Sequence, residues 1–527
     1  MTSLTGTAQL TRFILRLDRV RIPVWMFSIV AVIAVTTASI KGLYPTQASL
    51  DQAAAASQGN AGAIAFNGPA QGLDTVGGEV AFQGGALGMV LVALMSLFMC
   101  GSLTRGEEES GRLELLRSLP LGGHAHTAAT VLVVAAMNAT VAVLTTLSLL
   151  AQHLPVAGSV AFGTSFFLVG LFFSGVAILA AQITQNTRTV YGSAGAVLAA
   201  AFVLRAVGDA WGGTLSWLSP IGWAQKARPF AGERWWPFLI LVAGIAALGA
   251  ATAVLSVRRD LGGGLVAPRP GRSAASPSLG RPIGLAVRLQ RGSLIGWSAG
   301  ILVAGIAYGS LTPSIQAFIS SNKALVEMMA RAGGANLIDS YIATSFRIMA
   351  LIGAGFAVQS VARLRSEETA LLAEPILATP VSRWRWAASH LAVAFSGSAI
   401  VLAVAGLATG LSYGVAGGGP DVVPRVVGAA LVYVPAMWLL VGLTVALVGL
   451  LPDAIVASWI FLAICFVFGF LGDILKIPSW LRGVSPFEHV PQLPAAPLTV
   501  LPLVVLTALA AGLTVAGLAG FRRRDIG

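Results

Sequence analysis

Two acidic segments carry the side chains whose types and spacing could do chemistry. Residues 107–122 read EEESGRLELLRSLPLG, and residues 367–382 read EETALLAEPILATPVS. Carboxylates and a proline recur between the segments at the same spacing, and they are Glu107, Glu108, Glu114 and Pro120 in the first and Glu367, Glu368, Glu374 and Pro380 in the second. We interpret each segment as a short acidic helix that its proline ends.

These carboxylates favour binding to another protein. The cytoplasmic leaflet of a membrane is anionic and repels a carboxylate-rich helix beside it. A basic groove on a partner protein would give such a helix a role, and a solvated loop face is the alternative interpretation. We therefore treat both segments as candidate docking sites.

The residues that could suggest a catalytic, nucleotide-binding or metal-binding motif lack the spacing or the structural setting that each motif requires. A P-loop needs a lysine after a glycine-rich turn, and none of the four lysines follows a glycine: Lys41, Lys226, Lys323 and Lys476. Residues 296–300 read GWSAG, but this hydrolase-like pattern begins an apolar helix instead of following a strand. His124 and His126 lack the spacing of a helical metal pair. We expect no catalytic residue, cofactor or metal site in this chain.

Long apolar runs must position the acidic segments. Of the 527 residues, 56% are hydrophobic and only 10% are charged, whereas soluble domains are about 25% charged. About 20 apolar residues in a helix cross a bilayer core. We predict an all-α polytopic membrane protein with about twelve transmembrane helices, near residues 22–41, 85–104, 127–150, 160–183, 190–210, 236–256, 293–312, 344–363, 386–412, 426–450, 454–471 and 497–520.

The distribution of charge predicts the orientation. Basic residues concentrate on alternate loops, whereas the predicted first outer loop, residues 42–84, contains Asp51, Asp74 and Glu79. This asymmetry follows the positive-inside rule and predicts a multi-pass protein of the plasma membrane with both termini in the cytoplasm. The rule also accounts for the formal net charge of +12, so we predict no nucleic-acid partner.

Few charges lie within the predicted spans. Arg205 and Asp209 are four residues apart near the outer end of the fifth span, so they could pair on one helix face or snorkel to the outer interface. Arg347 begins the eighth span, and we expect it to snorkel as well. We predict no carboxylate at mid-span, which disfavours a proton-coupled pump.

The two halves of the chain repeat. Besides the acidic segments, three landmarks recur in the same order: RLDRVRIPVW (16–25) and RLQRGSLIGW (288–297), Ser219-Pro220 and Ser485-Pro486, and RRDLG (258–262) and RRDIG (523–527). We predict a first six-helix repeat at 1–264, a Pro/Gly/Ser/Arg linker at 265–284 and a second six-helix repeat at 285–527. Because each half has an even number of spans, we expect parallel repeats.

The acidic segments resemble the coupling segment of type-2 ABC exporter permeases, which has the form E-x-x-x-G-T-x-E-x-L-L-x-x-P-x-S. The matching residues are Glu108, Gly111, Glu114, Leu115, Leu116 and Pro120 in the first half and Glu368, Glu374, Thr379, Pro380 and Ser382 in the second. Arg112 replaces the usual threonine, Leu371 replaces glycine, and Pro375 follows the second glutamate. These departures predict a second coupling helix that is kinked or engages its partner differently. The whole chain resembles the fused actinobacterial permeases for polyketide antibiotics.

This resemblance implies coupling helices near residues 107–119 and 367–379 that dock a separate ABC ATP-binding subunit in two copies. ATP and magnesium are then expected on that partner subunit. The resemblance also implies short re-entrant helices in the outer loops 211–235 and 472–496. Because the Ser-Pro pairs recur there, we regard Ser219, Pro220, Ser485 and Pro486 as a candidate outer gate.

The sequence therefore predicts the permease of an ATP-driven exporter, not an enzyme. Its spans lie in the lipid bilayer, and their few fixed charges favour a hydrophobic or amphipathic cargo such as an antibiotic or drug. An ion-coupled secondary drug transporter is one alternative, which would need an embedded carboxylate. A membrane enzyme for lipid-linked substrates is another, and Glu488 with His489 is the nearest candidate cluster.

Overall fold

The computed structural model describes residues 3–58, 61–118, 120–210, 212–257, 264, 273–321, 337–471 and 478–523. These residues form helices joined by turns, and no strand occurs among them. Twelve helices in this part of the chain are long and apolar enough to cross a bilayer. The predicted all-α polytopic fold with about twelve transmembrane helices is thus confirmed. Residues 265–272 of the predicted linker and 472–477 of the last predicted outer loop lie outside the described residues.

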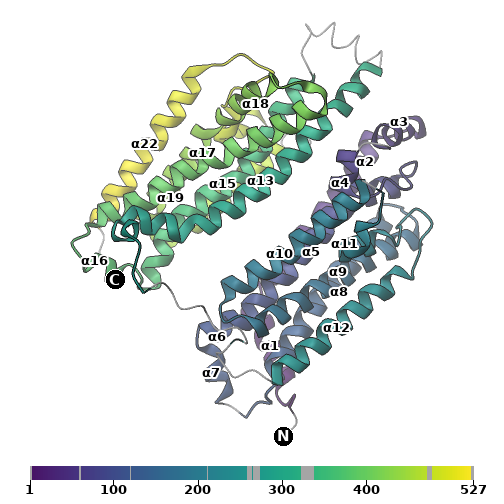
Figure 1. The fold of residues 1–527 in the computed structure, drawn as a ribbon, viewed down its shortest axis with the longest axis horizontal. Helices are drawn as coiled ribbons and strands as arrows, with labels where there is room; N and C mark the ends of the chain where they lie inside the picture. Colours follow the sequence, from purple (N-terminus) through teal and green to yellow (C-terminus); the bar gives the residue numbers. More distant parts are fainter. Residues whose placement is uncertain are drawn as a thin grey trace. The chain divides into compact units, whose positions relative to one another are not determined.

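The chain forms two compact units, Met1–Gly271 and Arg272–Gly527. The helices of the first unit are α1 (Thr7–Leu17), α2 (Arg21–Leu43), α3 (Gln47–Ser57), α4 (Ala61–Asn67), α5 (Val76–Gly101), η1 (Ser102–Gly106), α6 (Glu107–Glu109), α7 (Arg112–Arg117), α8 (Ala125–Ala151), α9 (Val156–Ile183), α10 (Thr187–Ala210), η2 (Leu215–Leu218), α11 (Pro220–Gln225) and α12 (Pro237–Val257). In Figure 1, α1, α6 and α7 lie at one end of this unit, and α3 and α4 lie at the other.

The helices of the second unit are η3 (Pro277–Gly280), α13 (Pro282–Ser321), α15 (Leu337–Thr369), α16 (Glu374–Leu377), α17 (Arg383–Tyr413), η4 (Gly414–Gly418), α18 (Val422–Leu431), α19 (Val434–Leu450), η5 (Pro452–Ala454), α20 (Val456–Leu471), α21 (Ser479–Arg482), η6 (Pro486–Glu488) and α22 (Val500–Arg523). We call the end of each unit with the short helices α6, α7 or α16 its predicted cytoplasmic end.

The first unit packs around α5 and α9. α5 contacts α2 and α9, and α9 contacts α8 and α12. Small residues permit this close packing, because a Cβ at Gly88 would lie 2.2 Å from the Phe166 ring. The buried Asn138 of α8 donates a hydrogen bond to the Ser96 hydroxyl of α5 at 3.0 Å. Glycines and one polar contact therefore hold three spans together where lipid supplies no hydrophobic drive.

Corresponding helices pack in the second unit. α15 contacts α13 and α19, and α19 contacts α22. At the last interface a Cβ on Gly449 would lie 1.9 Å from the carbonyl oxygen of Gly517, so the backbones of α19 and α22 are almost in contact. The units differ at their first span, because α1 and α2 are separate helices whereas α13 is one continuous helix.

The helix of the second predicted span begins earlier than expected. The outer loop expected at 42–84 contains α3 and α4 and ends early, since α5 begins at Val76. Glycines and Glu79 lower the hydropathy of this stretch, so its composition resembles that of a loop. Packing overrides composition: a Cβ on Gly77 would lie 2.5 Å from the Phe230 ring. Glycine is therefore required where α5 meets the outer segments.

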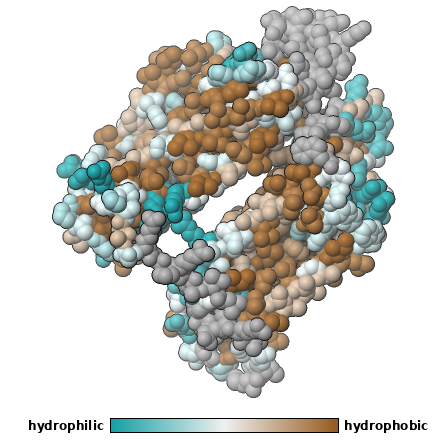
Figure 2. All heavy atoms as spheres, in the orientation of Figure 1, coloured by the Kyte–Doolittle hydropathy of each residue, from teal (hydrophilic) through white to brown (hydrophobic). Residues whose placement is uncertain are grey.

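The surface of each unit matches a membrane environment. Figure 2 shows hydrophobic residues along the length of the helices in each unit and hydrophilic residues near their ends. Among the exposed apolar side chains are Phe27, Leu239 and Val515, each from a helix that is long and apolar enough to span. Lipid is the solvent that such side chains need.

Candidate functional site

The first acidic segment begins as the end of a membrane span. α5 continues through the π-helical turn η1 into α6, at the predicted cytoplasmic end (Figure 1). The Arg105 side chain is only 1% exposed and contacts the Glu108 carboxylate at 2.6 Å. Its Nε donates a hydrogen bond to the Ala181 carbonyl at 2.7 Å. Arg105 therefore connects the end of the second span to the end of α9.

Glu109 adds a connection to the fifth span. Its carboxylate accepts hydrogen bonds from the backbone nitrogen of Thr187 at 2.8 Å and from the Thr187 hydroxyl at 2.7 Å. Thr187 begins α10, where unpaired N–H groups and the helix dipole favour a negative charge. Sequence reasoning missed Glu109, although the third consecutive glutamate was visible. We call Arg105, Glu108 and Glu109 the first anchor.

The second unit has a corresponding anchor. The Arg365 guanidinium contacts Glu368 at 3.4 Å and Asp453 at 3.1 Å. Asp453 lies in η5, the turn between α19 and α20. Arg365 therefore reaches from the end of α15 to the turn between α19 and α20, but Asp453 is 96% exposed, so solvent screens this contact. We call Arg365, Glu368 and Asp453 the second anchor.

Glu107 and Glu367 have different surroundings. Glu107 contacts Arg112 at 3.5 Å, and the Arg112 side chain is 61% exposed, so solvent screens this pair. Glu367 is 5% exposed and contacts Arg363 at 2.7 Å and the His390 ring at 3.5 Å. His390 belongs to α17, so Glu367 also contributes to the packing of α15 against the third span.

The prediction of one continuous acidic helix in each half is wrong. α6 and α7 are separated at Gly111, which has a φ of +72°, and α15 and α16 are separated at Leu371, which has a φ of +57°. A left-handed residue interrupts a right-handed helix. The second unit makes this break without glycine, at a steric cost. Pro375 does not kink α16, because it lies in the first turn, where proline is tolerated.

This break divides the predicted docking residues into two groups. Glu108, Glu367 and Glu368 lie in ion pairs and are mostly shielded from solvent. Glu114 of α7 and Glu374 of α16 are exposed. Apolar side chains beside them are exposed too, and they are Leu115 at 74%, Leu371 at 58% and Leu372 at 60%. We call Glu114 and Leu115, together with Leu371, Leu372 and Glu374, the coupling faces. Pro120 and Pro380 are exposed beyond these short helices.

The predicted gate residues begin short helices. Ser219 is buried, and its hydroxyl accepts a hydrogen bond from the Gly222 nitrogen at 3.3 Å. Pro220 follows as the first residue of α11. Ser485 is 1% exposed, and Pro486 begins η6. Both Ser-Pro pairs therefore start helical turns inside the protein.

Arg205 and Asp209 pair, and the snorkelling alternative is wrong. Their side chains are 0% and 6% exposed and approach to 3.9 Å, while Arg205 donates a hydrogen bond to the Phe66 carbonyl of α4 at 3.1 Å. Nearby, the Lys226 ammonium lies 4.6 Å from the centre of the Trp217 ring. Partial burial lowers the pKa of Lys226 below its ordinary value, and the nearby Asp209 carboxylate offsets only part of this shift. The cluster joins α10 to the outer segments.

Arg347 also does not snorkel. Its guanidinium contacts the Glu488 carboxylate at 3.2 Å, and the two side chains are 17% and 20% exposed. Because Glu488 belongs to η6, this pair connects the eighth span to the segment of Ser485-Pro486. Arg347 therefore positions a candidate gate helix instead of reaching toward lipid headgroups.

Two carboxylates are buried, although sequence reasoning placed Glu79 in an outer loop and did not single out Asp339. Glu79 is 2% exposed in the first turn of α5, and Asp339 is 8% exposed in the first turn of α15. Asp339 contacts Arg425 at 2.6 Å, whereas Glu79 accepts a hydrogen bond from Gln83 at 2.6 Å. Glu79 precedes the first acidic segment by the same number of residues as Asp339 precedes the second. This repetition was the signal that the sequence offered. Among the described residues, no three His, Cys, Asp or Glu side chains are placed to hold a metal.

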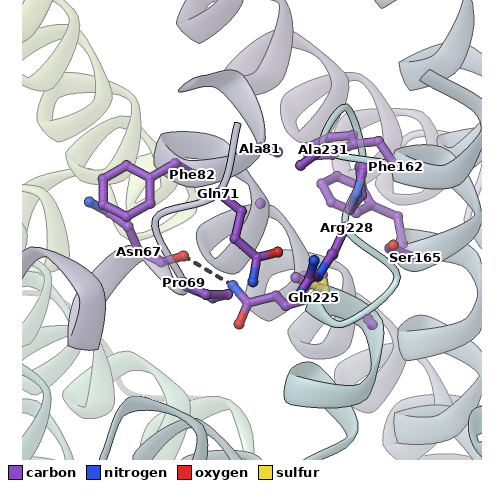
Figure 3. A pocket seen from close by; sticks show the side chains of 15 residues that line it. Asn67, Pro69, Gln71, Ala81, Phe82, Phe162, Ser165, Gln225, Arg228 and Ala231 are labelled. Carbon is purple, nitrogen blue, oxygen red and sulfur yellow. Dashed lines mark hydrogen bonds between the residues drawn. The ribbon is translucent and has the colours of Figure 1, made fainter. Parts of the chain in front are cut away.

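A small cavity lies in the first unit between α5, α9 and the segment after α11. Phe82 and Phe162 face it from the helices, and Asn67, Gln225 and Arg228 line its polar side (Figure 3). Gln225 donates a hydrogen bond to the Asn67 carbonyl at 3.0 Å. The cavity volume of about 40 Å³ is enough for water and too small for a drug-sized molecule.

Comparison with known proteins yields two likenesses. A family model described as "Multidrug efflux system permease Rv1217c, C-terminal domain" matches residues 279–522. The chain is also similar to the multidrug efflux system permease protein Rv1217c of Mycobacterium tuberculosis, with 39% identity over 527 residues. This match covers 99% of the chain and 95% of that protein, so the similarity extends through both units.

Proposed function

Because the chain belongs to the family of multidrug efflux system permeases, we propose that it is the permease of an ATP-driven ABC exporter. The chain is a multi-pass membrane protein and the transporting component of an efflux system. In this proposal a separate ATPase subunit, present in two copies, binds ATP and magnesium. The coupling faces are the surfaces that it contacts.

The observation that carries the proposal is the pair of anchors. In the first unit, Arg105 and Glu109 link the end of α5, just before α7, to α9 and α10. In the second unit, Arg365 links the end of α15 to the turn between α19 and α20. A force that reaches the end of α5 is therefore transmitted to α9 and α10, and one that reaches the end of α15 is carried less firmly toward α19 and α20, because Asp453 is exposed. A solvated loop without a partner has no need for such connections.

The exposed side chains indicate the chemistry of the ATPase surface. Each coupling face has an exposed glutamate beside exposed leucine. Leucine buries apolar area on docking, and a glutamate at the rim favours a basic partner surface and fast association. The anchoring glutamates Glu108 and Glu368 are already paired, so we assign them to transmission instead of docking.

The cargo in this proposal is hydrophobic or amphipathic and leaves the cell. Arg205 and Arg347 are paired with carboxylates, so neither offers an unpaired charge to an ionic cargo. The Glu79 carboxylate accepts a hydrogen bond from Gln83. The relative from Mycobacterium tuberculosis is named for multidrug efflux, which supports a drug-like cargo. The positive-inside rule supports cytoplasmic termini. We place the outer gate at Ser219-Pro220 and Ser485-Pro486, which begin buried turns.

The test is co-purification of the chain with its ATPase subunit in lipid, followed by ATPase measurement. Charge reversal on the coupling faces, Glu114→Lys with Glu374→Lys, is expected to reduce ATPase binding. The matched control reverses exposed acids at the opposite ends, Asp51→Lys with Asp421→Lys, and is expected to bind normally. If no ATPase subunit binds the unaltered chain, ATP-driven coupling is wrong. The buried carboxylate Glu79 would then be the first site to test for ion coupling.

A further inference from the structure

The second unit has a groove beside its coupling helix. The groove lies between the start of α13 and the start of α17, and both helices are long and apolar enough to span a membrane. Its volume is about 800 Å³, within the range of roughly 300–1,000 Å³ that is typical of ligand pockets. The span predicted within α17 begins at residue 386, so we expect Trp384 and Arg385 to lie near the lipid headgroups.

The lining of the groove changes from cationic to apolar along α17. Arg281 and Arg385 are exposed at the rim, and no acidic residue is among the described residues that line it. Trp384 is 50% exposed beside them, at the interfacial depth that tryptophan prefers. Ala388 and Ala392 follow one and two turns deeper into the span. A positive rim above an apolar wall is complementary to an anionic phospholipid.

In the first unit, backbone hydrogen bonds join the segments that precede α1 and α8. The Gly122 nitrogen donates a hydrogen bond to the Thr5 carbonyl at 2.9 Å, and the His124 nitrogen donates one to the Ser3 carbonyl at 3.0 Å. These bonds join the segment before α1 to the segment that follows α7. In the described part of the second unit, residues of the segments Arg281–Ile283 and Thr379–Val381 line the groove.

We propose that this groove binds an anionic phospholipid of the cytoplasmic leaflet. Arg281 and Arg385 donate charge-assisted hydrogen bonds to the phosphate, for which the planar guanidinium is well suited. The acyl chains lie along Ile283, Ala388 and Ala392. The lipid then lies beside Pro380, next to the second coupling helix. This binding does not depend on ATP or on an ATPase subunit.

The test measures lipid retention by the purified full-length chain in mild detergent, with phosphatidylglycerol and phosphatidylcholine as probes and native mass spectrometry as the readout. We expect phosphatidylglycerol to be retained preferentially. Arg281→Gln with Arg385→Gln is expected to weaken that retention roughly thirtyfold, since each basic contact contributes. Ala388→Trp, which fills the apolar wall and keeps both charges, is expected to reduce it as well.

The matched control is Arg522→Gln with Arg523→Gln, which removes two exposed arginines at the end of α22 in the same unit. This control is expected to retain lipid as the unaltered chain does. Equal retention of the two lipids, or equal loss in the control and groove variants, would overturn the proposal. Binding of inorganic phosphate as tight as that of phosphatidylglycerol would also overturn it, because the rim would then bind a soluble anion.

Discussion

Neutralising Glu108 should loosen the end of the second span in the first unit. The Arg105 side chain is 1% exposed and lies 2.6 Å from the Glu108 carboxylate, which is 14% exposed. Glu108→Gln preserves the shape of the side chain and removes its charge, so the Arg105 guanidinium loses a close counter-charge in a site where water cannot replace it. The change is therefore expected to weaken the first anchor without altering the coupling face.

The expected magnitude follows from the burial of the pair. Removing one partner of a buried ion pair costs about 3–5 kcal/mol, and the partial exposure of Glu108 places the cost near 3 kcal/mol. That free energy corresponds to roughly a hundredfold change in a local opening equilibrium. In the second unit, Arg365 is 29% exposed and keeps Asp453 at 3.1 Å. Glu368→Gln should therefore cost about 1 kcal/mol or less.

Thiol labelling can measure this opening, because the chain has two cysteines and both are free and buried. Cys100 lies on α5 just before η1, and Cys465 lies on α20. In purified protein, Glu108→Gln should accelerate labelling of Cys100 by roughly a hundredfold and leave Cys465 unchanged. Cys100→Ser and Cys465→Ser backgrounds assign each rate to one thiol.

Two outcomes would refute this reasoning. An unchanged Cys100 rate in Glu108→Gln would mean that the ion pair does not hold the helix end. Equal acceleration at Cys465 would mean that the change unfolds the whole chain. Glu368→Gln serves as the matched control, since it makes the same chemical change in the other unit and should leave the Cys100 rate unaltered.

Three further predictions concern the backbone and the helix contacts. Gly111→Leu should destabilise its segment by about 1–2 kcal/mol, because leucine must adopt a positive φ there, whereas Leu371→Gly should be tolerated. Tryptic cleavage at Arg112 should become faster in the Gly111→Leu variant alone. Gly449→Ala should cost about 1–3 kcal/mol, because its Cβ meets the Gly517 carbonyl. Gly512→Ala, where nothing lies within 4 Å of the added Cβ, should not change the stability. If the Gly449→Ala and Gly512→Ala proteins melt at the same temperature in detergent, the prediction is wrong. Asn138→Leu should cost about 1–3 kcal/mol by leaving Ser96 without its donor, and an unchanged melting temperature would argue against that bond.

The twelve spans were predictable because bilayer crossing depends on local composition. Their number and order agree with the sequence prediction, since a helix satisfies its own backbone hydrogen bonds and needs only apolar length. The boundary of α5 was not predictable in the same way. Its first turns contain Gly77, Gly78 and Glu79, and they are helical because they pack against Phe230 and Gly72, which lie in other segments.

In the acidic segments too, the sequence did not show which contacts the side chains make. Their positions and their repetition were visible in the sequence, and so was the resemblance to a permease coupling segment. Which glutamates face solvent was not visible. Glu108 and Glu368 share a motif with Glu114 and Glu374, yet the first two are paired with arginines and the last two are exposed. No break was predicted in either segment, although Gly111 is a residue type that readily adopts a positive φ, whereas Leu371 gave no such sign.

The sequence by itself determined the membrane environment, the repeated halves and the family, because these follow from apolar length and from residue identity in order. Tertiary structure decided which charges are fixed and which are exposed. Arg105 reaches Ala181, and Arg365 reaches Asp453, residues far away in the chain that only packing brings near. Around Arg105, which is 1% exposed, a distant partner also replaces water, and no local pattern records that partner.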